Sequence, residues 1–330
     1  MAEEAAAGVR VEGRIVPFPK SVSREARAFL ASRVGPDGLP QGARVAQPAP
    51  GDLAGWTAAQ AASAQMIYEL VAPAAAQLKS TAETIALGGT TAYLATPQHA
   101  GPDDRAYLDI HGGGLVHGAG AFCRHGALMN ADRHGVRCYA VDYRMPPAHP
   151  YPAALDDCVA AYRALLERYA PGRIAVGGGS AGGNLAAATV LRARDEGLPL
   201  PAALVLTTPE VDLTESGDSF ETNHLLDVVL PNRLMNANLL YAAGHDLSHP
   251  YLSPLFGDFT RGFPPTFLQA GTRDLFLSNT VRMHRALRRA GVEVELHIFE
   301  GMPHGGFMGA PEDVELAGEI ARFVAEHWAA

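Results

Sequence analysis

The amino-acid sequence predicts an α/β protein built on a mostly parallel, eight-stranded sheet with helices on both faces. From residue 82 onward, short apolar or β-branched runs alternate with helical stretches, which is typical of a parallel sheet covered on both sides. The chain has 330 residues, enough for one large domain. Because 48% of these residues are apolar, the chain can also build a sizeable core.

The strands are expected at intervals along this part of the chain. Two less regular ones lie near Ile85 and Tyr93, and six clear ones span 106–110, 138–143, 173–176, 203–207, 266–269 and 294–299. The clearest helix begins near Pro152, a residue type favoured in first turns, and carries apolar side chains at helical spacing as far as Tyr169. We expect this helix to cover one face of the sheet.

Two stretches do not follow the alternation. Residues 1–80 have the pattern of helices separated by polar segments, and residues 212–262 contain helical sequence and loops but no strand pattern. We interpret both stretches as additions that lie over one end of the sheet. The core would then consist of residues 81–211 and 263–330.

Composition and charge argue against several kinds of partner. The formal net charge is −9 and the arginines are scattered, so no basic surface for nucleic acid is expected. No apolar run is long enough to span a membrane, and residues 1–13 lack the apolar centre of a secretory signal. Cys123, Cys138 and Cys158 are odd in number and lack metal-ligand spacing, which favours free thiols and a cytoplasmic location.

A glycine-rich turn around Ser180 is the first segment that indicates chemistry. The sequence Gly178-Gly-Ser-Ala-Gly182 follows an apolar strand and precedes a helical stretch. A sharp turn of this kind exposes the serine hydroxyl, and the flanking glycines remove side chains that would crowd it. The helix N-terminus behind the serine offers unpaired N–H groups, so the amide of Ala181 can bind a developing oxyanion.

The same glycines allow two other interpretations. They could form a tight turn without any catalytic role. Gly177, Gly179 and Gly182 also match the Gly-x-Gly-x-x-Gly pattern of dinucleotide-binding proteins, which needs an acidic residue about 20 positions further on. Glu210 ends the next strand but lies 28 positions after Gly182. The dinucleotide interpretation also leaves the remaining motifs unexplained.

A second glycine run, His111-Gly-Gly-Gly114, directly follows the strand 106–110. Consecutive glycines expose backbone amides without hindrance, and the tetrahedral intermediate of acyl transfer needs such donors at its oxygen. Gly113 and Gly114 are therefore candidates for an oxyanion hole. The alternative is a plain loop, which is the commoner role of a glycine run after a strand.

An acid and a histidine follow the last two predicted strands. Asp274 comes after the seventh strand and His304 after the eighth. Because the C-terminal ends of parallel strands meet at one edge of a sheet, these residues can converge there with Ser180. The chain order Ser, Asp, His is that of a hydrolytic triad. Glu210 and Asp212, which follow the sixth strand, are competing candidates for the acid.

At these motifs the sequence resembles the hormone-sensitive-lipase-like group of α/β-hydrolases, the bacterial type IV carboxylesterases. The resemblance covers roughly residues 80–325 and rests on His111-Gly-Gly-Gly, Asp142-Tyr-Arg144, His149-Pro-Tyr-Pro-Ala-Ala154, Gly178–Gly183, Asp274 and Pro303-His304. It implies an α/β-hydrolase fold with a helical cap formed by residues 1–80 and 212–262. It also implies esterase or lipase activity without a metal or cofactor, and a homodimer that pairs through the last strand.

Some positions depart from the pattern of this group. Gly179 stands where the group usually has Asp or Thr, and Ala148 where it usually has Glu. Residues 275–279 lack the usual proline and second acid. These departures indicate a divergent branch and leave the substrate open. Residues of the expected cap that are candidates for lining a substrate pocket are Trp56, Met66, Leu225, Leu226 and Val229.

The sequence therefore predicts a carboxylesterase in which Ser180 attacks the ester carbonyl, His304 moves the proton and Asp274 orients the imidazole. Short water-soluble esters are the expected substrates, because no extended apolar surface suited to a lipid interface is visible. A lactone hydrolase with the same groups is the close alternative. A nicotinamide-dependent oxidoreductase and a catalytically inactive binding protein on the same scaffold are distant alternatives.

Overall fold

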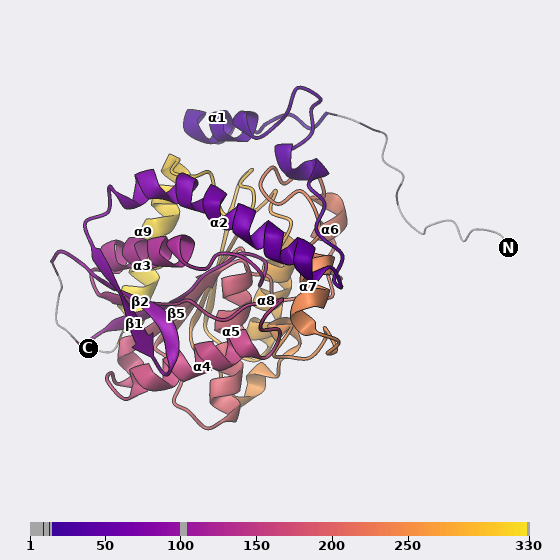
Figure 1. Ribbon diagram of the computed structural model, residues 1–330. Helices are drawn as coiled ribbons and strands as arrows, with labels where there is room; N and C mark the ends of the chain where they lie inside the picture. Colours follow the sequence, from indigo (N-terminus) through magenta and orange to yellow (C-terminus); the bar gives the residue numbers. More distant parts are fainter. Residues whose placement is uncertain (1–8, 10–12, 14, 100–103, 329–330) are drawn as a thin grey trace.

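The computed structural model describes residues 9, 13, 15–99 and 104–328 (Figure 1). An eight-stranded sheet runs through it, formed by β1 (Thr81–Leu87), β2 (Thr90–Thr96), β3 (Ala106–Ile110), β4 (Arg137–Val141), β5 (Ile174–Gly179), β6 (Ala203–Thr207), β7 (Thr266–Gly271) and β8 (Val294–Phe299). The strand order is β1-β2-β4-β3-β5-β6-β7-β8. β2 pairs antiparallel with β1 and β4, and all other neighbours are parallel. The predicted sheet is confirmed.

Both faces of the sheet are buried. In β3, Leu108 packs into one core cluster, and the preceding residue, Tyr107, packs into the second. In β6, Leu204 belongs to the first of these clusters and Val205 to the second. Since successive side chains of a strand point to opposite faces, burial on both sides requires an unbroken apolar run. This is why the central strands do not alternate with polar residues.

Helices cover the two faces (Figure 1). The larger cluster is closed by α4 (Ala153–Leu166), α5 (Ala181–Asp195) and α8 (Leu277–Arg289), and the smaller one by α3 (Ala121–His134) and α9 (Pro311–His327). The helix expected from Pro152 is α4, and Pro152 is its N-cap residue. The expectation of helices on both faces is confirmed.

The two stretches outside the alternation contain no strand in their described residues. Residues 15–80 form α1 (Arg24–Ser32) and α2 (Leu53–Ala75), and residues 212–262 form α6 (Ser219–Thr222) and α7 (Met235–Ala242). Short 3₁₀ turns lie at Gln41–Arg44, Pro171–Arg173, Pro254–Phe256 and Phe259–Arg261. Most of the first 14 residues of the N-terminal stretch lie outside the described residues.

Hydrogen bonds join the N-terminal stretch, residues 15–80, to the segment 212–262. Asn236 Nδ2 donates to Pro48 O at 3.1 Å, and Asn232 Nδ2 donates to Ala43 O at 3.1 Å. Trp56 of α2 is buried in one cluster with residues of α7. The N-terminal stretch and the segment 212–262 therefore pack as neighbours, although about 130 residues of the core separate them in the chain.

Two further expectations can be compared with the structure. In the described ranges, none of the helices combines the length and the hydropathy that a membrane span requires. Cys123, Cys138 and Cys158 are all free, as expected from the sequence, and the structure shows that all three are buried.

Candidate active site

Ser180 lies at the turn between β5 and α5. Its backbone has φ 57° and ψ −126°, a left-handed conformation that is strained for any residue with a side chain. Its amide donates to Thr207 O at 2.9 Å, and its carbonyl accepts from the amides of Gly183 and Glu210. The residue is only half-buried. The backbone of the turn is thus held from both sides while the hydroxyl stays accessible.

Glycines around Ser180 are required by close packing. A Cβ added at Gly178 would lie 2.3 Å from Gly182 O, and one added at Gly182 would lie 1.9 Å from Ile110 O. Either side chain would force α5 away from the sheet. A Cβ at Gly179 would lie 2.9 Å from the hydroxyl oxygen of Thr207. Gly179, where the resembled group usually has Asp or Thr, therefore lies close to the side chain of Thr207.

His304 and Asp274 form a hydrogen-bonded chain with Ser180. His304 Nε2 lies 2.9 Å from Ser180 Oγ, and His304 Nδ1 lies 3.0 Å from Asp274 Oδ1. Because a carboxylate oxygen accepts, Nδ1 carries the ring proton and Nε2 can accept the hydroxyl proton of the serine. The ring of Phe276 packs edge-on against the imidazole, with 5.0 Å between centroids.

The turn after β7 orients the carboxylate of Asp274, which is fully buried. Its Oδ1 also accepts from the amide of Phe276 at 2.9 Å, whereas Oδ2 has no hydrogen-bond partner in the described part of the chain. Asn223, from the segment 212–262, donates to the Asp274 carbonyl at 2.8 Å. The acid is therefore held by its own turn and by the segment above it.

A second buried carboxylate, Asp227, lies beside these residues and was not predicted from the sequence. A carboxylate oxygen of Asp227, a carboxylate oxygen of Asp274 and a ring nitrogen of His304 all lie within 4.8 Å of one another. Asp227 Oδ2 accepts from the backbone amides of Leu275 (2.9 Å) and His304 (3.1 Å), so it joins the acid turn to the histidine loop. Its Oδ1 accepts two amides of its own turn. The surrounding sequence carries no signal of this role, because two of the donors come from distant loops.

The nearby carboxylates raise the pKa of His304. Burial alone would lower the pKa of the imidazole, but the charge and hydrogen bond of Asp274 and the charge of Asp227 outweigh it. Burial, followed by repulsion from Asp274, raises the pKa of Asp227 to about 6. A histidine with a raised pKa is a stronger base toward the serine hydroxyl.

The two competing acids have other surroundings. The carboxylate of Asp212 binds Arg282 at 2.6 Å and two hydroxyl groups of its own loop. Glu210 is buried beside the Ser180 turn, and neither of its carboxylate oxygens has a hydrogen-bond partner in the described ranges. Burial, with repulsion from Glu215, raises the pKa of Glu210 to about 8. Of the three acids, Asp274 is the one hydrogen-bonded to His304.

The loop of residues 112–114 lies against the Ser180 turn. A Cβ added at Gly112 would lie 3.3 Å from the Cβ of Ser180. Gly113 (φ 123°) and Gly114 (φ 59°) have backbones that favour glycine. Their amides donate to no acceptor in the described chain, and the amide of Ala181, the first of α5, has no acceptor within its helix. Three N–H groups, two in this loop and one at the start of α5, therefore have no acceptor among the described residues.

The candidate pocket residues differ in their surroundings. Trp56 is buried in a cluster with Val116, which follows the glycine loop closely in the chain. Leu225 and Leu226 are half-buried. In contrast, Met66 and Val229 are 64% and 43% exposed. The structure thus brings Trp56 toward the site but not Met66.

Leu234 is an apolar neighbour of the site that sequence reasoning missed. A Cβ at Gly114 would lie 3.4 Å from Leu234 Cδ1. Leu234 also packs both on the Trp56 cluster and on a cluster that contains Phe276. It therefore connects the glycine loop with the side chain that packs on His304. Only its place in an apolar, strand-free segment could have suggested this position.

Comparison with known proteins decides the family. A model of the family described as alpha/beta hydrolase fold matches residues 107–308. The chain belongs to this family. The crystal structure of esterase E25 superposes with a TM-score of 0.88 and 34% identity, over 98% of this chain and 99% of that chain. A crystal structure of an esterase from the bacterial hormone-sensitive lipase family gives 0.76 and 30%, over 93% and 99% of the two chains.

Sequence relatives of this α/β-hydrolase carry hydrolase names. An acetyl-hydrolase of Streptomyces hygroscopicus is 37% identical over 67% of this chain and 74% of the relative. An esterase of Acinetobacter venetianus is 33% identical over 65% and 72% of the two chains. The resemblance to the hormone-sensitive-lipase group, predicted from the motifs, is confirmed. The dinucleotide-binding interpretation finds no support among these proteins.

Proposed function

We propose that this α/β-hydrolase is a carboxylesterase with Ser180 as nucleophile, His304 as base and Asp274 as the acid that orients the base. The observation that carries the proposal is the hydrogen-bonded chain from Asp274 Oδ1 through the imidazole to Ser180 Oγ. Family membership and the esterases and acetyl-hydrolase among its relatives support carboxylic esters as the bonds cleaved.

The acylation step uses each group in turn. Ser180 Oγ attacks the ester carbonyl carbon while His304 Nε2 takes the hydroxyl proton. The carbonyl electrons move to the oxygen, and the amides of residues 113, 114 and 181 bind the resulting oxyanion. His304 then gives its proton to the leaving alkoxide, and an acyl-serine remains. Throughout, Asp274 holds the tautomer and stabilises the imidazolium.

Deacylation repeats the same steps with water. His304 takes a proton from a water molecule, the hydroxide attacks the acyl carbon, and the oxyanion forms again in the same site. The collapse of this intermediate releases the carboxylic acid, and the proton on His304 returns to Ser180. The chain's own residues supply every proton transfer, so this route needs no cofactor.

We further propose short water-soluble esters as substrates, under a cap formed by the N-terminal stretch and residues 212–262. Trp56 and Leu234 present apolar side chains beside the glycine loop, and Phe276 does so beside His304. Side chains packed this closely favour small acyl groups. The three free buried thiols support a reducing, cytoplasmic environment. A homodimer through β8, the last strand of the sheet order, stays a prediction that light scattering would test.

The proposal is tested first with Ser180→Ala. We expect kcat to fall by about 10⁴ to 10⁶ with an unchanged unfolding midpoint, and labelling by a fluorophosphonate probe to disappear. Ser248→Ala, at an exposed serine, is the matched control and should behave as wild type. A Ser180→Ala protein that keeps a tenth of the wild-type activity would refute the assignment of the nucleophile.

Substrate size is tested with p-nitrophenyl acetate, butyrate, octanoate and palmitate, together with lactones of graded ring size. We expect kcat/KM to be highest for the acetate or butyrate. A preference for palmitate would contradict the proposed short-chain specificity. Faster turnover of lactones than of all open esters would favour the lactone hydrolase, which uses the same catalytic groups.

A further inference from the structure

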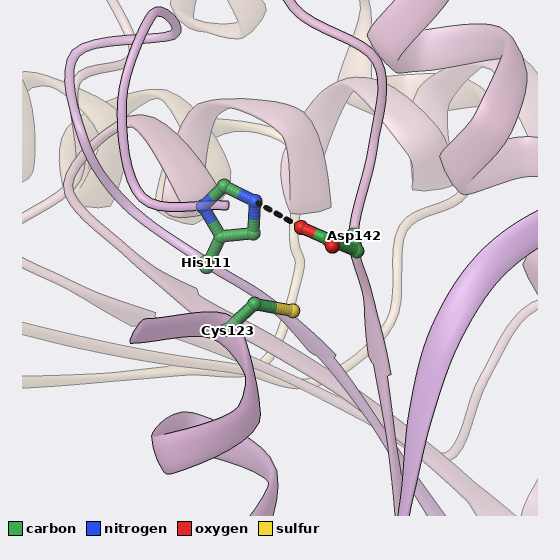
Figure 2. A group of neighbouring side chains, drawn as sticks. All are labelled: His111, Cys123 and Asp142. Carbon is green, nitrogen blue, oxygen red and sulfur yellow. Dashed lines mark ion pairs between the residues drawn. The ribbon is translucent and has the colours of Figure 1, made fainter. Parts of the chain in front are cut away.

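A second group of potential metal-binding atoms includes His111, the residue that precedes the glycine loop (Figure 2). Ligand atoms of His111, Cys123 and Asp142 all lie within 4.8 Å of one another. His111 directly follows β3, Cys123 is in the first turn of α3, and Asp142 directly follows β4. None of the three takes part in the proposed reaction. Spacing along the chain predicted no metal site, because these residues are 12 and 19 positions apart and meet only in the fold.

The hydrogen bonds of His111 determine which of its nitrogens can bind an ion. Nδ1 lies 2.8 Å from Gly112 O. Because a carbonyl oxygen only accepts, Nδ1 carries the proton and Nε2 keeps its lone pair. Neutral imidazole with a free Nε2 lone pair is the form that binds metal ions.

This lone pair has no partner. Nε2 is buried without a hydrogen bond in the described part of the chain. It faces Asp142 Oδ1 at 4.0 Å, which is too far for a hydrogen bond (Figure 2). The ring cannot turn away easily, because it stacks on Tyr143 with 4.0 Å between centroids. A buried polar atom left without a partner costs about 1 to 3 kcal/mol, so a ligand at this position would be stabilising.

Asp142 connects the group to the surface. Its side chain is 16% exposed, and the residue lines a surface pocket of about 480 Å³ that Asp156 and Asp157 also line. Arg192 pairs with Asp156 and Arg144 with Asp157. Asp142 has no ion pair with a lysine or arginine among the described residues. It is therefore the carboxylate of this pocket whose charge remains available to an incoming cation.

We propose that His111, Cys123 and Asp142 bind a divalent cation of the Zn²⁺ class, and that this binding inhibits ester hydrolysis. One nitrogen, one sulfur and one oxygen ligand suit Zn²⁺ or Cd²⁺ and leave a fourth position for water. Mg²⁺ and Ca²⁺, which prefer oxygen ligands, do not fit. Binding breaks the S–H bond of Cys123, forms a metal–sulfur bond and releases the proton to solvent.

Inhibition follows from the place of His111 in the chain, and this half of the inference rests on the proposed function. Metal–nitrogen and metal–oxygen bonds of about 2.0 to 2.2 Å put two tetrahedral ligands about 3.4 Å apart. His111 Nε2 and Asp142 Oδ1 lie 4.0 Å apart, so closing the site pulls the imidazole toward Asp142. His111 Nδ1 holds Gly112 O, so the amides of the glycine loop move with the ring. A displacement of about 1 Å can cost roughly a hundredfold in rate.

The test uses CdCl₂ with the full-length protein, because a cadmium–thiolate bond has its own ultraviolet absorption. In wild type we expect one bound ion per chain by calorimetry, the cadmium–thiolate band, and a rate of p-nitrophenyl acetate hydrolysis at least about tenfold lower. Cys123→Ser should lose the band, and both Cys123→Ser and Asp142→Asn should weaken binding by about tenfold or more. Cys158→Ser, at a buried cysteine outside the group, is the matched control and should keep the band and the inhibition.

Three results would overturn the proposal. Asp227, Asp274 and His304 form a second group whose side-chain oxygen and nitrogen atoms lie within 4.8 Å of one another, but this group contains no sulfur. An ion bound there would inhibit hydrolysis without giving the cadmium–thiolate band, and it would still inhibit the Cys123→Ser protein. A band that survives in Cys123→Ser but disappears in Cys158→Ser would assign binding to the wrong cysteine. A band with full activity would overturn the inhibitory role. Absence of ester hydrolysis in the metal-free protein would instead refute the proposed function, and binding would still be measurable.

Discussion

At the scale of single residues, the position of Ser180, the proposed nucleophile, depends on side chains that are absent. The strained turn is possible because Gly178, Gly182 and Gly112 let three backbone segments meet around it. The pattern of glycines predicted this turn from the sequence alone. The close contact at Gly179 could not be predicted in the same way, because Thr207, whose side chain lies next to this glycine, belongs to the next strand.

Gly182→Ala tests this packing. The added methyl group would lie 1.9 Å from Ile110 O, a backbone atom that cannot turn aside. We expect a loss of about 1 to 3 kcal/mol in unfolding free energy, measured with urea, and a clear fall in kcat. Gly318→Ala, in α9, is the control, because the added Cβ would meet no atom within 4 Å. That change should stabilise the protein by about 0.5 to 1 kcal/mol. Equal effects of the two substitutions would contradict the packing argument.

Asp274→Asn tests the assignment of the acid. The amide cannot hold the protonated Nδ1 of His304 as a carboxylate does, so the wrong tautomer becomes favourable. We expect kcat to fall by about 10³ to 10⁴ near neutral pH, with a smaller change in KM. Glu210→Gln and Asp212→Asn are measured alongside. If Asp274→Asn stays within tenfold of wild type while one of the others loses its activity, the acid has been assigned wrongly.

The pH dependence of activity should follow His304. Below its pKa the imidazole already carries a proton and cannot take one from Ser180, so kcat/KM falls on acidification. Because the surrounding carboxylates raise the pKa of His304, the midpoint of this fall should lie above the ordinary value of 6.5. A pH profile of kcat/KM with a short ester measures it. A midpoint below 6.5 would mean that burial outweighs the carboxylates.

At the scale of elements, the loops after β7 and β8 are linked through the segment 212–262, which contains Asp227. Asp227 accepts one amide from each of these loops, at Leu275 and His304. The strands that precede Ser180, Asp274 and His304 could be predicted from apolar runs and from the residues that end them. Asp227, Leu234 and Phe276 could not, because their roles depend on how distant loops pack and not on any local pattern.

Asp227→Asn tests this link. One oxygen becomes an NH₂ group that faces N–H donors, so the histidine and acid loops should separate slightly. We expect kcat to fall by about tenfold to a hundredfold, with less effect on KM. Removal of the charge should also lower the pKa of His304, so the acidic limb of kcat/KM moves to lower pH. A structural defect alone would not move this limb. Asp218→Asn, at an exposed acid in the same segment, is the control.

At the scale of the whole molecule, activity and stability should respond to pH in opposite directions. Burial raises the pKa of Glu210 to about 8 and that of Asp109 to about 7. The folded protein keeps these protons, whereas the unfolded chain releases them near pH 4 to 5. Their contribution to stability is therefore complete at low pH and is lost as the pH rises to about 8.

The window from pH 6.5 to 8 isolates this effect. Burial lowers the pKa of His111 to about 4 and that of His134 to about 3. These histidines oppose the acids only below pH 6.5, where the unfolded chain gains protons that the folded protein does not. Above pH 6.5 the raised pKa of His304 acts in the same direction as the acids. Unfolding free energy should then fall with pH while kcat/KM rises.

Glu210→Gln separates the two trends. Between pH 6.5 and 8.0 the wild-type protein should lose about 2 kcal/mol of unfolding free energy through Glu210 alone, since one pKa unit corresponds to about 1.4 kcal/mol. The glutamine variant has no proton to hold, so its loss over the same range should be smaller by about that amount. Urea unfolding at the two pH values measures both. Glu83→Gln, at an exposed residue of β1, should follow the wild type. Equal losses in Glu210→Gln and wild type, or a wild-type protein that becomes more stable toward pH 8, would show that the carboxyl of Glu210 is ionised in the folded enzyme.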